Sequence, residues 1–296
     1  KLKIHLFTLP RWFAIPFFGS ALILGSILAG GSFGDLHLWL GLITGLLIMA
    51  GGHSFNSYLD YVWTGIDKGE VDERSAEKSY TGGQSLIAKG LVSTREVLAN
   101  ACMWYVIALI PLVYLSTKTS WRLLLVGLLA MMITFWYSKA KFNWTHELAL
   151  GTGVGPLAVL LGMFSVNVDP PWVNGLIVST PIAIILSFAG LALDEWPDAE
   201  ANLKKGVKSI AYKIGSWGFD LGTYLMIWIG MMYVYQAFLI SIGMLYPLTW
   251  ITFFLVFPFI ACSVALKLHF EKVAPVYVII GALYPILLVL GQVLGG

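Results

Sequence analysis

The chain has 296 residues, of which 58% are hydrophobic and only 11% are charged, and its mean hydropathy is +0.81. A soluble domain averages roughly 25% charged residues. This composition excludes a soluble globular protein and indicates an integral membrane protein, whereas the formal net charge of +2 decides nothing by itself. No long soluble block interrupts the apolar stretches, so we expect a single transmembrane domain, residues 1–296, and no nucleic acid partner.

Nine stretches of the chain are apolar and long enough to cross a bilayer, which takes about 20 residues of helix. We therefore predict an all-α fold of nine transmembrane helices. The predicted spans are, in chain order, Phe13–Ala29, His37–Tyr61, Val97–Ser116, Leu123–Ser138, Leu148–Val166, Val173–Leu193, Phe219–Ile242, Pro247–Leu268 and Pro275–Leu294.

The positions of Lys and Arg predict the orientation of these spans. If the N-terminus lies inside and the C-terminus outside, 16 of the 18 basic residues fall inside, and only Lys118 and Arg122 fall outside. Because cytoplasmic loops carry the excess of Lys and Arg, this is the favoured orientation. It places two long polar connections, Val62–Glu96 and Asp194–Trp217, on the cytoplasmic face of what we expect to be the cell membrane.

A first polar cluster lies at the inner end of the second predicted span. At about 100° per residue, Asn56 and Asp60 lie about 40° apart on one helix face. Asp67 would share that face if the helix continued past Gly65, and Thr64 is the alternative third member. Charged groups at membrane depth are costly and usually functional. Carboxylate and amide oxygens on one face suit a hard cation such as Mg²⁺.

A glycine pair follows this cluster in the first long connection. The backbone amides of Gly82 and Gly83 could cradle a phosphate. The alternative is a solvated loop that ends in an ordinary turn.

A second polar cluster follows the sixth predicted span and matches the first. Asp194, Asp198 and Asn202 step by four along one helix face, and we expect the intervening Glu195 and Glu200 to be solvated. Carboxylates that hold a metal, followed by lysines that hold phosphate oxygens, make a diphosphate site. The lysines that follow are Lys204, Lys205 and Lys208. The alternative is a salt-bridged amphipathic helix on the membrane surface, which leaves the matching first cluster unexplained.

The two clusters read as Asn56-Ser57-Tyr58-Leu59-Asp60 and as Asp194-Glu195-Trp196-Pro197-Asp198, the latter followed by Asn202, Gly206, Lys208 and Ser209. They resemble the two aspartate-rich motifs of the UbiA superfamily of intramembrane prenyltransferases. Ser57 stands where a second Asp is common, Asp194 replaces an Asn, and Asn202 replaces an Asp. The segment 81–87 resembles a glycine turn of the branch that prenylates dihydroxynaphthoate to make menaquinone.

The resemblance implies a fold in which two pseudo-repeated halves, each carrying one motif, surround a central cavity. It implies Mg²⁺-dependent transfer of a prenyl group from a polyprenyl diphosphate to an acceptor, often an aromatic quinone precursor, with membrane lipid around the protein. The metal ligands would be Asn56, Asp60, Asp67, Asp194, Asp198 and Asn202, with Asp60, Asp67 and Asp198 as the catalytic set. Phosphate contacts would come from Arg74, Lys139, Lys141, Lys208, Gly82 and Gly83. The acceptor or prenyl pocket would include Tyr58, Tyr61, Trp136 and Tyr137.

Two histidines lie near these motifs. Because a lone histidine is usually a hydrogen-bonded structural group, we expect His53 and His146 to be structural, and we look for a base in Asp67 or another acid of the first connection.

Two other classes of protein remain as alternatives. A transporter would place its polar residues near the bilayer midplane, whereas these acids lie at one face beside basic loops. A catalytically silent lipid-binding relative is the other alternative, indicated by Ser57 and Asn202.

Overall fold

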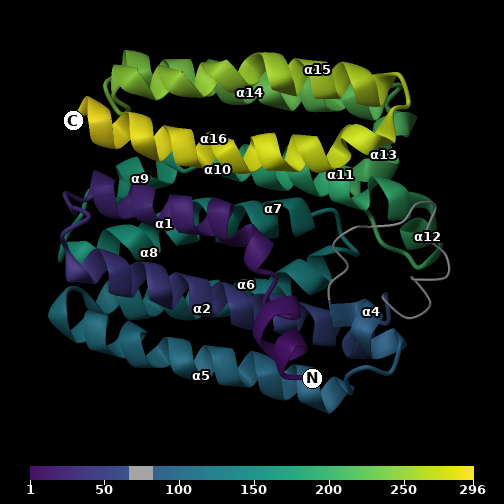
Figure 1. Ribbon diagram of the computed structural model, residues 1–296, viewed down its shortest axis with the longest axis horizontal. Coiled ribbons are helices and arrows are strands. Elements are labelled where there is room, and N and C mark those ends of the chain that lie inside the picture. Colours follow the sequence, from purple (N-terminus) through teal and green to yellow (C-terminus); the bar gives the residue numbers. More distant parts are fainter. Residues whose placement is uncertain (67–82) are drawn as a thin grey trace.

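In the computed structural model, which describes residues 1–66 and 83–296, the chain is a bundle of helices (Figure 1). The described residues contain no strand and include nine helical segments that are long and apolar enough to cross a membrane. The predicted fold class and number of spans are therefore confirmed. The segments are Ile4–Leu28, Leu36–Trp63, Thr94–Lys118, Trp121–Ala140, His146–Val166, Trp172–Lys204, Leu221–Ser241, Pro247–Lys267 and Ala274–Gly295.

Most of these spans contain more than one helical element. The α-helices are α1 (Ile15–Leu28), α2 (Leu36–Tyr58), α4 (Gly83–Ala88), α5 (Thr94–Lys118), α6 (Trp121–Ala140), α7 (His146–Thr152), α8 (Ala158–Val166), α9 (Trp172–Val178), α10 (Thr180–Ala183), α11 (Leu191–Glu195), α12 (Ala199–Lys204), α13 (Ile210–Ser216), α14 (Leu221–Ser241), α15 (Val256–Lys267) and α16 (Ala274–Gly295). Short 3₁₀ turns are Trp12–Ala14, Trp196–Asp198, Pro247–Leu255 and Glu271–Val273. Wider π-helical turns are Ile4–Thr8, Leu59–Trp63, Gly153–Leu157 and Ile184–Gly190.

Short polar side chains determine where several of these helices begin. Asp35 accepts a hydrogen bond from the backbone N–H of His37 at the start of α2. Ser93 and Glu96 form a reciprocal capping box at the start of α5. Such caps satisfy backbone N–H groups that have no partner within the helix, so the local sequence sets the starts of these spans.

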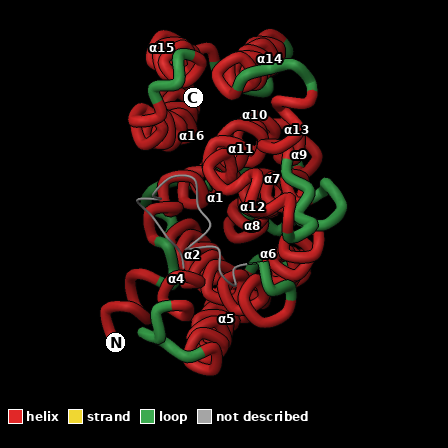
Figure 2. The backbone as a smooth tube through the Cα atoms, turned by 90° about the vertical axis from the view of Figure 1, so that its right-hand side faces the viewer, coloured by secondary structure: helices red, strands yellow, loops and turns green. Residues whose placement is uncertain are grey.

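The helices are arranged in three tiers that can be followed in Figures 1 and 2. The C-terminal helices α14, α15 and α16 form one side of the bundle, and α2 and α5 pack together on the other. Helix α1 lies between the two sides, where it contacts α2, α8 and α16. The inner tier, with α1 and α7 to α11, therefore separates the two sides, and it lines the interior together with α2, α6 and α16.

The predicted ends of the sixth span are wrong in one respect. The span was expected to end at Leu193, but the helical path continues through the second cluster to Lys204. The polar connection after it is correspondingly shorter than predicted. The reason is that the cluster, although charged, is composed of residues that a helix accommodates, because the 3₁₀ turn Trp196–Asp198 admits Pro197 near its start.

Helices α1 and α8 touch backbone to backbone. A Cβ atom placed on Gly25 would overlap the carbonyl group of Val159, and one placed on Gly162 would overlap the carbonyl group of Leu22. Small residues allow such close approach in membrane bundles, where packing rather than the hydrophobic effect drives helix association. The Ser26 hydroxyl, which donates to the Gly162 carbonyl oxygen at 3.0 Å, adds a hydrogen bond to the same contact.

We expect Gly162→Ala to lower the free energy of unfolding by about 1–3 kcal/mol, because the added methyl group forces α1 and α8 apart. The matched control is Gly230→Ala on α14, where a Cβ meets no atom within 4 Å. Thermal or chemical denaturation in detergent measures both. Equal stabilities for the two variants would contradict the backbone contact.

Candidate functional site

The first cluster is held by hydrogen bonds at the end of α2. The Asn56 amide nitrogen donates to Asp60 Oδ2 at 2.8 Å and to the Ser138 hydroxyl at 3.1 Å. Lys141 Nζ lies 2.6 Å from the same Asp60 oxygen. Asp60 is only 1% exposed, so a charged carboxylate at this position requires these partners. The predicted spacing of four residues does bring Asn56 and Asp60 together.

The second cluster lies where the sixth span changes its helical geometry. Helix α11 ends at Glu195, the turn Trp196–Asp198 is 3₁₀, and α12 follows. Because a 3₁₀ turn has 3.0 residues per turn rather than 3.6, a step of four no longer keeps one face. Asp194 is accordingly exposed toward the interior cavity, while Asp198 and Asn202 are buried.

The two clusters lie at the same end of the bundle and are bonded to each other's segments. Lys205 Nζ, which follows the second cluster, donates to the carbonyl oxygen of Ile66, which follows the first, at 2.9 Å. The backbone N–H of Lys208 donates to the carbonyl oxygen of Lys141 at 2.7 Å. Lys141 also pairs with Asp60. Hydrogen bonds and this ion pair therefore join the connection that follows the second cluster, the residue after α6 and the first cluster.

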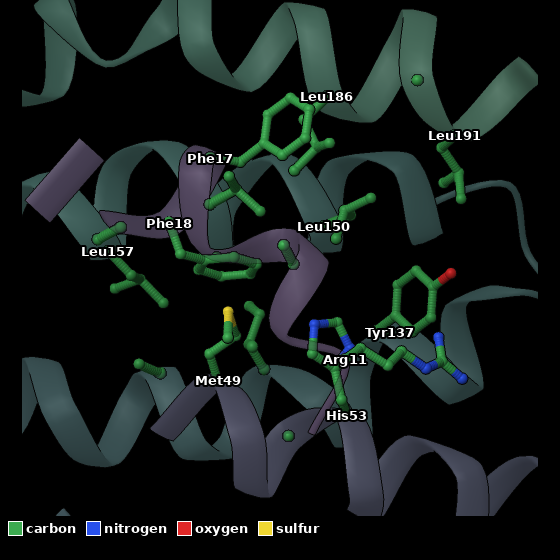
Figure 3. Close-up of a pocket in the computed structure, with 18 of the residues that line it drawn as sticks. Arg11, Phe17, Phe18, Met49, His53, Tyr137, Leu150, Leu157, Leu186 and Leu191 are labelled. Carbon is green, nitrogen blue, oxygen red and sulfur yellow. The ribbon is translucent and has the colours of Figure 1, made fainter. Parts of the chain in front are cut away.

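A cavity of about 270 Å³ opens between the clusters and extends into the bundle (Figure 3). Its polar end contains Arg11, His53, Asn56, Tyr137 and Asp194. Its body is apolar, and its lining includes Phe17, Phe18, Met49, Leu150, Leu157 and Leu186. Asn56 and Asp194 belong to different clusters, so both clusters border one chamber. The predicted central cavity is therefore present.

Among the four predicted pocket aromatics, Tyr137 lines this cavity. Tyr58 and Tyr61 instead pack against a small separate core beneath the N-terminal segment. Trp136 is 42% exposed on the outer surface of α6. None of these three is among the described residues that line the cavity.

The predicted phosphate contacts occupy different environments. Lys141 is largely buried beside Asp60, Lys139 Nζ lies 4.1 Å from the centre of the Trp63 ring, and Lys208 is exposed. Gly83 begins α4. The remaining predicted site residues, Asp67, Arg74 and Gly82, lie outside the described residues.

One buried polar network was not predicted. His146 Nε2 lies 3.1 Å from Glu195 Oε2, and His146 Nδ1 lies 3.3 Å from Glu147 Oε2. The Ser209 hydroxyl also donates to Glu195, and the backbone N–H of Ile210 donates to Glu147 at 3.0 Å. The prediction that Glu195 is solvated is wrong, because it is 7% exposed and bonded within this network. The sequence does contain a signal for this network, the adjacent His146 and Glu147 at the start of an apolar span, because acids in such spans usually have partners.

Two further residues of the cavity, Arg11 and His53, were not predicted to line it. Arg11 has a left-handed backbone (φ 54°) at a break in the first span, and its side chain lines the polar end. Its guanidinium group donates to the Ser57 hydroxyl at 3.4 Å. His53 Nε2 is buried and has no hydrogen-bond partner among the described residues, contrary to the structural role expected of it.

Comparison with known proteins places this arrangement in a family. The sequence model described as the UbiA prenyltransferase family matches residues 17–277. A curated relative, the 1,4-dihydroxy-2-naphthoate octaprenyltransferase of Bacillus subtilis (strain 168), is 29% identical over 189 residues. That alignment covers 62% of this chain and 57% of the relative, so the chain matches less than two thirds of that protein's length.

Solved structures share the whole fold at low sequence identity. The apo UbiA homologue from Aeropyrum pernix K1 superposes with a TM-score of 0.73 at 16% identity, covering 96% of this chain and 98% of that one. The UbiA homologue from Archaeoglobus fulgidus bound to DMAPP and Mg²⁺ has a TM-score of 0.61 at 15% identity, covering 97% and 98%. A digeranylgeranylglyceryl phosphate synthase has a TM-score of 0.63 at 15% identity, covering 99% and 98%. At these identities the likeness shows the fold.

We expect Glu195→Ala to lower the free energy of unfolding by about 1–3 kcal/mol, because it leaves His146 and Ser209 without their buried acceptor. Glu200→Ala, which removes an exposed carboxylate five residues further on, is the matched control and should change stability little. Denaturation of both variants in detergent measures the difference. A Glu195→Ala protein as stable as the control would show that the network contributes nothing.

Proposed function

The chain belongs to the UbiA prenyltransferase family, and on this premise we propose that it is a prenyltransferase that transfers a prenyl group from a polyprenyl diphosphate to an aromatic acceptor in a Mg²⁺-dependent reaction. The observation that carries the proposal is the convergence of both acidic clusters on the polar end of one apolar cavity. A prenyl diphosphate has the same division, with a polyanionic head and a hydrocarbon tail.

The residues of the two clusters fit a hard divalent cation. Within the described part of the chain, Asp60 Oδ1 and Asn202 Oδ1 are buried and accept no hydrogen bond. Oxygen atoms of carboxylates and amides are the ligands that Mg²⁺ prefers, and it usually shares them with substrate phosphates. The residues that would hold it are Asn56, Asp60, Asp67, Asp194, Asp198 and Asn202. Bound there, Mg²⁺ would supply positive charge that stabilises the departing diphosphate.

Basic side chains at the same end would bind the diphosphate directly. Lys141 lies deepest, against Asp60, and Lys139 and Lys208 lie nearer the solvent. Arg74, Gly82 and Gly83 complete the proposed set. Charge-assisted hydrogen bonds to phosphate oxygens are the stronger kind, so these groups would fix the head of the donor while its tail enters the cavity.

The body of the cavity would hold the prenyl chain and exclude water. When the bond between the prenyl carbon and the diphosphate oxygen breaks, an allylic cation forms that water would otherwise capture. The rings of Phe17, Phe18 and Tyr137 line the cavity, and the faces of aromatic rings attract a cation. The apolar lining therefore serves the chemistry as well as the binding of the tail.

An aromatic quinone precursor is the acceptor that we favour. The curated relative is named for transfer to 1,4-dihydroxy-2-naphthoate, and the apolar cavity suits a flat ring. The distribution of Lys and Arg places this end of the bundle on the cytoplasmic side of the cell membrane in our proposal.

Purified protein in detergent or vesicles should release diphosphate from a polyprenyl diphosphate when Mg²⁺ and 1,4-dihydroxy-2-naphthoate are both present. Chelation of Mg²⁺ should stop the release, because the negative charge of the leaving group is then uncompensated. Radiolabelled prenyl donors of several chain lengths and product extraction measure the transfer. If no donor length and no hydroxylated aromatic ring gives product, the protein is a catalytically silent relative.

Asp60→Asn and Asp198→Asn should each lower kcat by at least about 100-fold without unfolding the protein, because each removes a carboxylate charge and keeps the shape. Asp169→Asn is the matched control, since Asp169 lies on an exposed loop and pairs with Arg122. Melting temperatures of all three confirm folding. Full activity in either cluster variant would show that the proposed ligand set is wrong.

A further inference from the structure

The polar end of the cavity contains a histidine that the proposed reaction does not use. His53 lines the cavity, and its Nε2 atom is buried without a hydrogen-bond partner in the described part of the chain. A buried polar group that lacks a partner costs about 1–3 kcal/mol. Native proteins retain such groups where a ligand supplies the missing bond, and the His53 side chain, to which this nitrogen belongs, lines a cavity that a ligand can enter.

The position of His53 along α2 separates it from the diphosphate site. Gly45, Met49, His53 and Asn56 line the cavity in turn along this helix. At 1.5 Å per residue, His53 lies about 4.5 Å deeper than Asn56. It therefore stands where the polar end meets the apolar body. A multiply charged head is disfavoured at that depth, whereas the carbon next to the head, where the new bond forms, would lie near it.

Other polar and aromatic groups line the same cavity from the neighbouring elements. Arg11 comes from the break in the first span, Tyr137 from α6, Asp194 from α11 and Tyr277 from α16. Figure 3 shows Arg11 beside the His53 ring, with Tyr137 at the same end. The Phe18 ring lies edge-on to the imidazole, with centroids 6.1 Å apart, so the deeper side of His53 is aromatic. The His53 ring thus lies between the Arg11 side chain and an aromatic ring at the wall of the cavity.

We propose that His53 Nε2 accepts a hydrogen bond from a ring hydroxyl of the acceptor and so selects hydroxylated aromatic rings. This inference rests on the proposed function. Only an electron-rich ring attacks the allylic cation, and the ring carbon that forms the new bond then loses its proton. A free hydroxyl supplies that electron density, whereas the carbonyl groups of an oxidised quinone withdraw it. A hydrogen bond from the hydroxyl to the imidazole increases the density further and fixes the ring beside the carbon that it attacks.

The test compares acceptors with and without the hydroxyl hydrogen in two proteins. The acceptors are 1,4-dihydroxy-2-naphthoate and its two mono-methyl ethers, which keep an electron-rich ring. In the unmodified protein we expect one ether to react about 10- to 100-fold more slowly in kcat/KM, the loss of one buried hydrogen bond. In His53→Phe, which keeps a ring of similar size, that ether and the parent should differ by less than about threefold.

Three controls show whether the discrimination between acceptors belongs to His53. His37→Phe, at the opposite end of α2 and outside the cavity lining, should keep the discrimination of the unmodified protein. The KM for the prenyl diphosphate should stay within about twofold in His53→Phe, because His53 lies below the head. His53→Gln, which retains an acceptor atom, should keep at least part of the discrimination and serves as the test if His53→Phe does not fold.

The possible outcomes separate the role of His53 from the proposed function. Transfer to the parent acceptor with the same ether discrimination in the unmodified protein and in His53→Phe would overturn the role of His53 and leave the prenyltransferase intact. Equal rates with all three acceptors in the unmodified protein would also overturn the role of His53 and leave the prenyltransferase activity intact. A rise in KM for the donor alone would place His53 with the diphosphate, and absence of any transfer would overturn the proposed function and the role of His53 together.

Discussion

The end of the molecule that carries the two clusters depends on compensating buried charge, and the ion pair between Asp60 and Lys141 does so for the first cluster. A carboxylate that is 1% exposed at the end of an apolar bundle is stable only if a partner compensates its charge. Lys141, the residue that follows α6, supplies that charge, and its own carbonyl oxygen is bonded to the backbone of Lys208. Three segments far apart in the sequence are therefore joined by the need to compensate a single buried charge.

The same constraint explains the network beneath the second cluster. Glu147 and Glu195 are buried on either side of His146, and Ser209 and the backbone of Ile210 supply further donors. These bonds connect the start of the fifth span, the end of α11 and the start of α13. Asp194 is the next residue before Glu195, so its position at the cavity depends on the network. A structural acid, Glu195, thus lies between two proposed functional acids, Asp194 and Asp198.

The sequence predicted the all-α fold, the nine spans and the family, because each depends on long apolar stretches or on spaced motifs. It also predicted that Asn56 and Asp60 are close, since an offset of four residues is a property of the helix alone. It did not predict the burial of Glu195 or the position of His53 in the cavity, because both depend on partners from other helices. The aromatic residues show the same limit: Tyr137 and Trp136 are neighbours in sequence, yet one lines the cavity and the other faces outward.

The glycine contact between α1 and α8 also limits how the interior can change its volume. Both helices contribute walls to the cavity, and their backbones already touch at Gly25 and Gly162. With no side chain between them to compress, α1 and α8 cannot approach each other more closely. A bulkier ligand must be accommodated by side-chain rotation or by outward displacement of helices. An empty cavity cannot shrink by closer packing of α1 against α8. The separation of these two wall helices is thus set by two residues that carry no side chain.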